Sequence, residues 1–224
     1  MSLSDNLEKI YHKIENAKNR SGLNRSVQLI AVTKTHPFSS IEECYALGIK
    51  TIGENRIQEA LQKFNSFDSM PGLTKRFIGH LQSNKINKCL ELFDAIDSVD
   101  SLKLAMKIGN KNKSIPVLLE VNTSGEPQKY GFNPDDVDSM IAATSTQNII
   151  VKGLMTVGPL TRNEKKIRES FSVLRELKEK INTHFSTNKL TELSMGMSDD
   201  YEIGIEEGST MVRIGSALFG RRKF

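Results

Sequence analysis

The chain has 224 residues, 38% of them hydrophobic and 26% charged, which suffices for a packed core in one or two domains and excludes a disordered chain. Its longest apolar runs fall short of the roughly 18 residues of a membrane span, and the charged N-terminal segment lacks the apolar stretch of a secretory signal. We therefore expect a cytoplasmic protein that contacts no membrane. The formal charge of +4 is modest and spread along the chain, so it distinguishes neither a phosphate ligand nor a nucleic acid.

Short apolar strands alternate with amphipathic helices along the chain. Strands are expected at residues 28–34, 51–55, 76–80, 95–99, 115–121, 149–156, 190–194 and 211–215. Helices are expected at the N-terminus, at 39–47, 57–64 and 84–92, from 101 onward, and at 163–185 and 201–207. Eight strand-then-helix units without a linker predict an α/β fold, a single (β/α)8 TIM barrel with an extra N-terminal helix and one domain over residues 1–224. An open doubly wound sheet is the alternative, but no Gly-x-Gly-x-x-Gly follows the first strand.

The cysteines and histidines have no zinc-ligand spacing, so no metal site is predicted. Cys44 and Cys89 are too few for a disulfide framework. Each lies in an apolar helical segment, where we expect a buried thiol.

The working face of such a barrel is built from the C-terminal ends of its strands and the loops after them. Polar residues predominate at these positions in the predicted strands. The resulting candidates are Lys34, Asn55, His80, Asn122, Met155, Thr156, Ser194, Arg213 and Gly215.

Lys34 is the first chemical signal, because it ends an otherwise apolar strand. Burial lowers the pKa of a lysine and frees a nucleophilic amine, which is what a carbonyl compound needs to form a Schiff base. The alternative is a lysine that points outward or pairs with a loop carboxylate.

Small and hydroxyl residues after the seventh and eighth strands are the second signal. Ser194, Ser198, Gly215 and Ser216 would donate hydrogen bonds to a phosphate group, and Arg213 would add a fixed positive charge. The alternative is that the glycines only make tight turns. Together with Lys34, these segments predict a site for an aldehyde that carries a phosphate, and pyridoxal 5'-phosphate (PLP) is the candidate ligand.

Two further residues carry weaker signals. His80 would either contact the ligand or cap the loop that follows its strand. Lys129, after the fifth strand, would either place a second amine near the barrel mouth and capture the aldehyde as it leaves Lys34, or be an ordinary solvated lysine.

Six segments carry a resemblance to a known family. They are Val32-Thr-Lys34, Gly53-Glu-Asn55, Phe77-Ile-Gly-His-Leu-Gln-Ser-Asn-Lys85, Gly153-Leu-Met155, Leu193-Ser-Met-Gly-Met-Ser-Asp-Asp200 and Gly208-Ser-Thr-Met-Val-Arg-Ile-Gly215. In this order they closely resemble the pyridoxal phosphate homeostasis protein family, which includes the YggS-like proteins and the proline synthase co-transcribed homologue.

The resemblance implies a barrel similar to the N-terminal domain of alanine racemase. It implies that Lys34 holds PLP as an internal aldimine, that Ser194, Ser198, Gly215 and Ser216 surround the phosphate, and that Arg213 faces the pyridine nitrogen. Asn55, His80 and Met155 lie in the same shared segments and complete the expected contact set.

The function we expect is PLP homeostasis: a carrier or buffer that holds PLP on Lys34 and releases it to acceptors such as PLP-dependent apoenzymes. No catalytic residue is assigned, and a monomer is expected. Alanine racemase needs a second base, a tyrosine from a C-terminal domain. This chain stops directly after the eighth strand, and none of its tyrosines is assigned that role, so a two-base racemase is disfavoured.

The alternative is a weak PLP-dependent amino-acid racemase or lyase with Lys34 as its only base. A Schiff-base aldolase fits the phosphate segments in part, but a lysine on the first strand does not favour it. A nucleic-acid binder ranks last, because the chain has no basic helix or interleaved aromatic residues.

Overall fold

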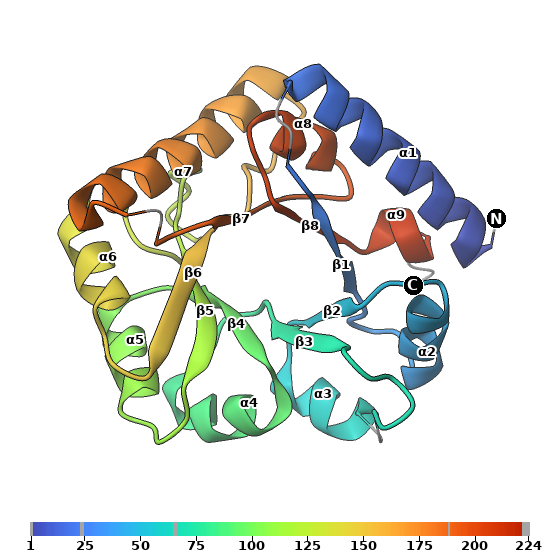
Figure 1. The fold of residues 1–224 in the computed structure, drawn as a ribbon, viewed down its shortest axis with the longest axis horizontal. Helices are drawn as coiled ribbons and strands as arrows, with labels where there is room; N and C mark the ends of the chain where they lie inside the picture. Colours follow the sequence, from blue (N-terminus) through green and yellow to red (C-terminus); the bar gives the residue numbers. More distant parts are fainter. Residues whose placement is uncertain (1, 23–24, 65–66, 188, 221–224) are drawn as a thin grey trace.

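The computed structural model describes residues 2–22, 25–64, 67–187 and 189–220. Eight parallel strands form a closed barrel in chain order, and pairing of β1 with β8 completes the circle. Helices surround the strands, as Figure 1 shows in a view down the barrel. The predicted (β/α)8 barrel with an extra N-terminal helix is therefore confirmed.

The strands are β1 (Gln28–Val32), β2 (Thr51–Glu54), β3 (Thr74–Phe77), β4 (Ala95–Val99), β5 (Ile115–Glu120), β6 (Ile149–Met155), β7 (Glu192–Met197) and β8 (Met211–Ile214). The α-helices are α1 (Leu3–Ser21), α2 (Phe38–Ala46), α3 (Ile57–Lys63), α4 (Ile86–Leu92), α5 (Leu102–Gly109), α6 (Val137–Thr144), α7 (Glu164–Phe185), α8 (Tyr201–Glu206) and α9 (Ser216–Phe219), and a 3-10 turn, η1, spans Ser83–Lys85.

The strand bounds differ from the expected ones at two sites that matter. β1 ends at Val32, so Lys34 lies in the turn after the strand. β7 runs from Glu192 to Met197, so Ser194 lies inside the strand instead of at its end. The helix α6, between β5 and β6, was not expected from the sequence.

Alternation along each strand decides which side chains face the barrel interior. On β8, Val212 and Ile214 pack outward with the helices, so the residue between them, Arg213, faces inward. β1 alternates in the same way, and Ile30 stands beside Arg213 in the β1–β8 pairing. The interior layer contains Ile30, Leu118, Met155 and Met211.

The apolar layer between barrel and helices contains both cysteines, Cys44 and Cys89, as buried thiols. Burial raises the pKa of each thiol to about 12. The predicted burial of both cysteines is therefore confirmed, and such thiols are poor nucleophiles.

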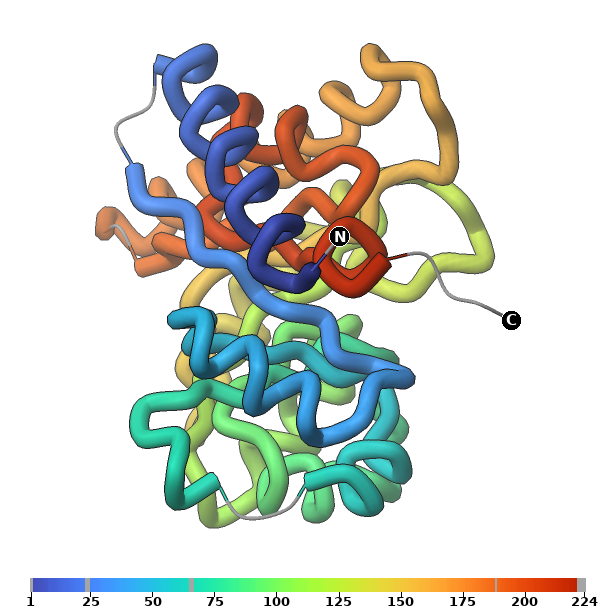
Figure 2. Tube along the Cα trace, turned by 90° about the vertical axis from the view of Figure 1, so that its right-hand side faces the viewer, coloured from blue at the N-terminus to red at the C-terminus, as the bar shows by residue number. Residues whose placement is uncertain are grey.

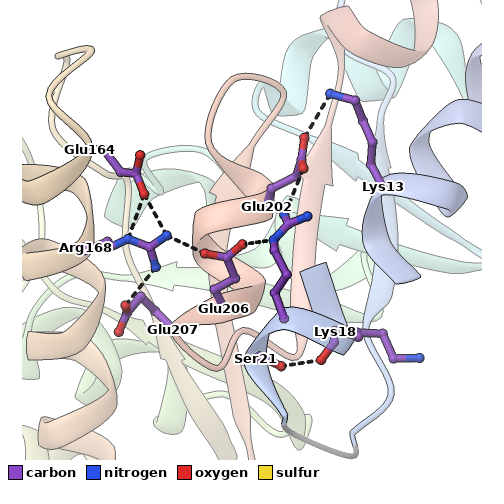
Figure 3. A network of polar contacts seen from close by, with 9 residues as sticks. Lys13, Lys18, Ser21, Glu164, Arg168, Glu202, Glu206 and Glu207 are labelled. Carbon is purple, nitrogen blue, oxygen red and sulfur yellow. Dashed lines mark hydrogen bonds and ion pairs between the residues drawn. The ribbon is translucent and has the colours of Figure 1, made fainter. Parts of the chain in front are cut away.

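The N-terminal helix α1 packs against α8 and α9, the last two helices that the structure describes (Figures 1 and 2). Its side chains join a charged layer that runs to α8 and α7 (Figure 3). Lys13 pairs with Glu202 at 2.9 Å, and Arg20 pairs with Glu206 at 2.5 Å. Arg168 of α7 completes the layer by pairing with Glu206. The layer therefore ties α1 and α7 to α8, the helix that follows the serine-rich β7 turn.

Within the described parts of the chain, no helix is both long enough and apolar enough to span a membrane.

Candidate PLP-binding site

A cavity of about 660 Å³ opens at the C-terminal end of the barrel. Its walls come from the turns after β1, β2, β3, β6, β7 and β8, the face where such barrels bind ligands. Of the nine residues expected to contact PLP, six line it: Lys34, Asn55, Ser198, Arg213, Gly215 and Ser216. Its size lies in the range of small-molecule sites.

Lys34 occupies a β-turn that closes when the His36 amide donates to the Thr33 carbonyl at 3.0 Å. Thr35, the third residue of the turn, has a positive φ of 67°. Such a conformation is unfavourable for a β-branched residue, so the turn needs support from its surroundings. It turns Lys34 from the end of β1 into the cavity wall.

The serine turn after β7 meets the turn after β8 on the opposite wall. The Ser198 hydroxyl accepts hydrogen bonds from the amides of Gly215 at 3.2 Å and Ala217 at 3.1 Å. Gly196, two residues before Ser198, has φ of 96°, and a Cβ there would lie 2.7 Å from the Tyr201 Cα. Glycine therefore permits the sharp bend that brings Ser198 over β8. Ser216 also lines this wall and is exposed to solvent.

Arg213 gives the cavity a buried positive charge. Its guanidinium donates to the Ser194 hydroxyl at 2.7 Å, the Ser194 carbonyl at 2.8 Å and the Thr156 carbonyl at 2.7 Å. Burial lowers the pKa of Arg213, and the negative charges of Asp97, Glu120 and Asp200 act in the opposite direction. Among the described residues, no carboxylate pairs directly with Arg213, so the site suits a ligand that supplies a hydrogen-bond acceptor or negative charge.

The other three expected contact residues, Ser194, Met155 and His80, lie outside the cavity lining. Ser194 is fully buried in β7, and its hydroxyl holds Arg213. Met155 belongs to the interior layer, against which the cavity residue Val157 packs. Both residues thus support the cavity from beneath.

His80 lies beyond β3, next to the cavity residue Gly79. Its Nδ1 lies 3.0 Å from the Asp100 carboxylate, and its ring stacks on Tyr130 with centroids 3.8 Å apart. Glu120, at the end of β5, lies in the same region, where burial first and the charge of Asp100 second raise its pKa to about 7, while Arg213 acts against them.

Lys129 and Asn122 belong to the loop after β5. The Lys129 ammonium donates to the Gly158 carbonyl at 2.7 Å and pairs with Glu126 at 2.9 Å. The Asn122 amide donates to the Glu126 carbonyl at 2.9 Å, which closes the loop. Lys129 therefore stands beside the loop that carries the cavity residue Val157.

Sequence reasoning missed several cavity residues, of which His36 and Gly79 are the clearest. The His36 ring stacks on Phe219 of α9 with centroids 4.2 Å apart. A Cβ at Gly79 would lie 2.1 Å from the Asn55 carbonyl oxygen, so only glycine allows the two backbones to approach. Glycine after an apolar strand was the available signal for Gly79, whereas nothing in the sequence connects His36 with Phe219.

Comparison with known proteins finds relatives that are similar to this chain in sequence and others that are similar in fold alone. The profile of the family "Alanine racemase, N-terminal domain" matches residues 6–223. A pyridoxal phosphate homeostasis protein of Aquifex aeolicus is 38% identical over 100% of both chains. The structure of PipY from Synechococcus elongatus with PLP bound superposes with a TM-score of 0.84 at 35% identity, covering 98% of this chain and 100% of PipY. An alanine racemase of Clostridium difficile shares the fold alone, with a TM-score of 0.74 at 15% identity over 98% of this chain and 61% of its own.

The fold and the cavity define a barrel of the alanine racemase N-terminal-domain class. Within that class, identities of 36–38% over the whole chain show that the chain belongs to the pyridoxal phosphate homeostasis protein family.

Proposed function

We propose that this chain binds PLP through an imine with Lys34 and acts in PLP homeostasis as a carrier that stores and releases the aldehyde. The observation that carries the proposal is that one cavity is lined by Lys34, by Arg213 and by the turns after β7 and β8, which contain Ser198 and Ser216. The relative with PLP bound and the names of the curated relatives support it.

The donor set of the cavity fits PLP group by group. A phosphate oxygen near the Ser198 turn would meet the same Gly215 and Ala217 amides that the Ser198 hydroxyl now contacts. Arg213 would face an acceptor such as the pyridine nitrogen. Lys34 would supply the amine, and the aldehyde supplies reversible imine chemistry.

Arg213 also limits the chemistry that a bound amino acid could undergo. A guanidinium donates hydrogen bonds and does not release its proton, so it leaves a pyridine nitrogen unprotonated and limits electron withdrawal from a bound amino acid. We propose that the barrel acts as one binding domain over residues 1–224, as a cytoplasmic monomer, with PLP-dependent apoenzymes as acceptors.

The experiment is a visible absorbance spectrum of PLP-loaded protein before and after borohydride, followed by peptide mapping. We expect a yellow band that bleaches and leaves a pyridoxyl group on Lys34. Incubation with an apoenzyme should then transfer PLP and restore that enzyme's activity. A colourless, unlabelled protein would contradict the proposal.

A weak racemase or lyase is the second candidate, favoured by the His80–Asp100 pair beside the cavity. An imidazole backed by a carboxylate is a common acid–base arrangement. This candidate predicts deuterium exchange at the Cα of a small amino acid, lost in Lys34→Ala and reduced in His80→Asn. The carrier predicts transfer to apoenzymes without such exchange.

A further inference from the structure

A buried ionic cluster lies behind the Lys34 turn, on the outer side of the barrel. Ile52 packs outward with the helices, so Glu54, two residues later on β2, also faces outward. Lys63, at the end of α3, forms an ion pair with Glu54 and lies 3.4 Å from Glu59. The side chains of Lys63 and Glu54 are only 7% and 0% exposed.

Each member of the cluster bonds to the chain immediately before or after Lys34. The Lys63 ammonium donates to the Thr33 carbonyl at 2.8 Å. The Thr33 hydroxyl donates to the Glu54 carboxylate at 2.5 Å, and the Thr35 amide donates to Glu59. Both peptide neighbours of Lys34 are thus anchored, and among the described residues Glu54, Glu59 and Lys63 are not part of the cavity lining.

These hydrogen bonds support a turn whose backbone conformation is unfavourable. Thr35 holds a positive φ of 67°, a conformation that glycine or asparagine adopts more readily than a β-branched residue does. Outside support is what keeps such a conformation populated. The Thr33 carbonyl accepts from both the His36 amide that closes the turn and the Lys63 ammonium, so α3 braces the same atom that defines the turn.

A contribution to the stability of the fold does not by itself explain why this position holds a buried ionic cluster. Buried ion pairs cost desolvation and are often replaceable by apolar residues without loss of stability. One carboxylate oxygen, Glu54 Oε2, is buried without a hydrogen-bond partner among the described residues, which adds to that cost. The three donors of Lys63 meet three acceptors, on Thr33, Glu54 and Glu59, so its geometry serves support and not reaction with an aldehyde.

We propose that Lys63, fixed between Glu54 and Glu59, is a positioning residue that sets the Lys34 turn and thereby presents the Lys34 amine to an aldehyde. This inference rests on the proposed function, in which Lys34 is the binding amine.

The test compares Lys63→Met and Glu59→Ala with wild type and with a matched control, Lys88→Met, which removes a lysine from the exposed Lys88–Glu91 pair on α4. Two measurements follow imine formation at Lys34, by borohydride trapping and peptide mapping. One uses PLP and the other salicylaldehyde, which has no phosphate and so reports on the Lys34 amine without the phosphate contacts. A third measures hydrogen exchange of the Thr35 amide without any aldehyde. Circular dichroism selects a temperature at which every variant is folded.

We expect Lys63→Met to slow imine formation with both aldehydes by about tenfold or more, as small misplacements of a reacting group do, and to speed exchange of the Thr35 amide. Glu59→Ala removes the Thr35 acceptor and the 3.4 Å contact with Lys63, leaves the Lys63–Glu54 pair in place and keeps a good helix former in α3, so it should fold and show a smaller change in the same direction. Lys88→Met should match wild type.

Wild-type rates and wild-type Thr35 exchange in folded Lys63→Met would overturn the proposal. If Lys63→Met does not fold, unchanged rates and exchange in Glu59→Ala would overturn it in the same way. A borohydride-trapped adduct on Lys63 of wild type would also overturn it, because Lys63 would then be a binding group. Failure of the proposed function is distinguishable, since wild type and Lys88→Met would then form no imine on Lys34.

Discussion

Replacing Glu120 by glutamine should stabilise the protein at pH 8 and leave its stability nearly unchanged at pH 5. Glu120 ends β5 and faces the barrel interior, because Leu119 and Val121 pack outward. Burial, and secondly the charge of Asp100, raise its pKa from 4.5 to about 7 against the opposing effect of Arg213. The glutamine side chain has nearly the same shape and cannot ionise.

The magnitude follows from proton linkage. A carboxyl group with a raised pKa binds more protons in the folded than in the unfolded protein, so its stabilising contribution is present at low pH and is lost as pH rises toward 7. At about 1.4 kcal/mol per pKa unit, wild type loses about 2 kcal/mol between pH 5 and pH 8 through this group, and the Glu120→Gln variant does not.

The assay is urea unfolding of wild type and Glu120→Gln at pH 5 and pH 8, with Glu42→Gln on the exposed side of α2 as the control. Comparing the two proteins at each pH cancels the other carboxyl groups. A stability difference of the same size at both pH values would refute the reasoning, because Glu120 would then titrate as an exposed carboxyl does.

Three further predictions concern the cavity and its supports. Gly79→Ala places a methyl group against the Asn55 carbonyl and should lower the free energy of unfolding by about 1–3 kcal/mol, with weaker PLP binding, as measured by denaturation and by absorbance titration. Arg168→Met removes a branch of the charged layer in Figure 3 and should cost about 1 kcal/mol at low ionic strength, less in 1 M salt; an equal loss at both would exclude an electrostatic role. Lys129→Ala should slow transfer of PLP to an apoenzyme if Lys129 captures the departing aldehyde, and an unchanged transfer rate would remove that role.

The spacing of apolar residues and the order of the strands were enough to predict most of the fold. Because apolar strands and amphipathic helices alternate regularly, the barrel and the cavity face followed from the sequence. The helix α6 was missed because the segment after β5 lacks a clear stop signal and its periodicity is short. β7 extends past its expected end because Gly196 continues the strand in a conformation that local propensity does not reveal.

The site was predicted less completely, because some of its contacts join residues that lie far apart in the sequence. Residues at strand ends share an edge of the barrel, so Lys34, Asn55 and Arg213 were found. The Lys63–Glu54 cluster was not, because it depends on how α3 folds back behind β1 and β2. Ser194 was expected to contact phosphate, and only the register of β7 and β8 shows its hydroxyl under Arg213.

Closure of the barrel has a consequence for when the site exists. Lys34 follows the first strand and Arg213 lies on the last, and they meet only because β1 pairs with β8. A growing chain therefore contains Lys34 long before the opposite wall of the cavity has been made. A ligand held from both walls binds the closed barrel and not the open chain, so it stabilises the β1–β8 seam by mass action. Any fluctuation that parts this seam would separate the Lys34 turn from the Arg213 wall of the cavity.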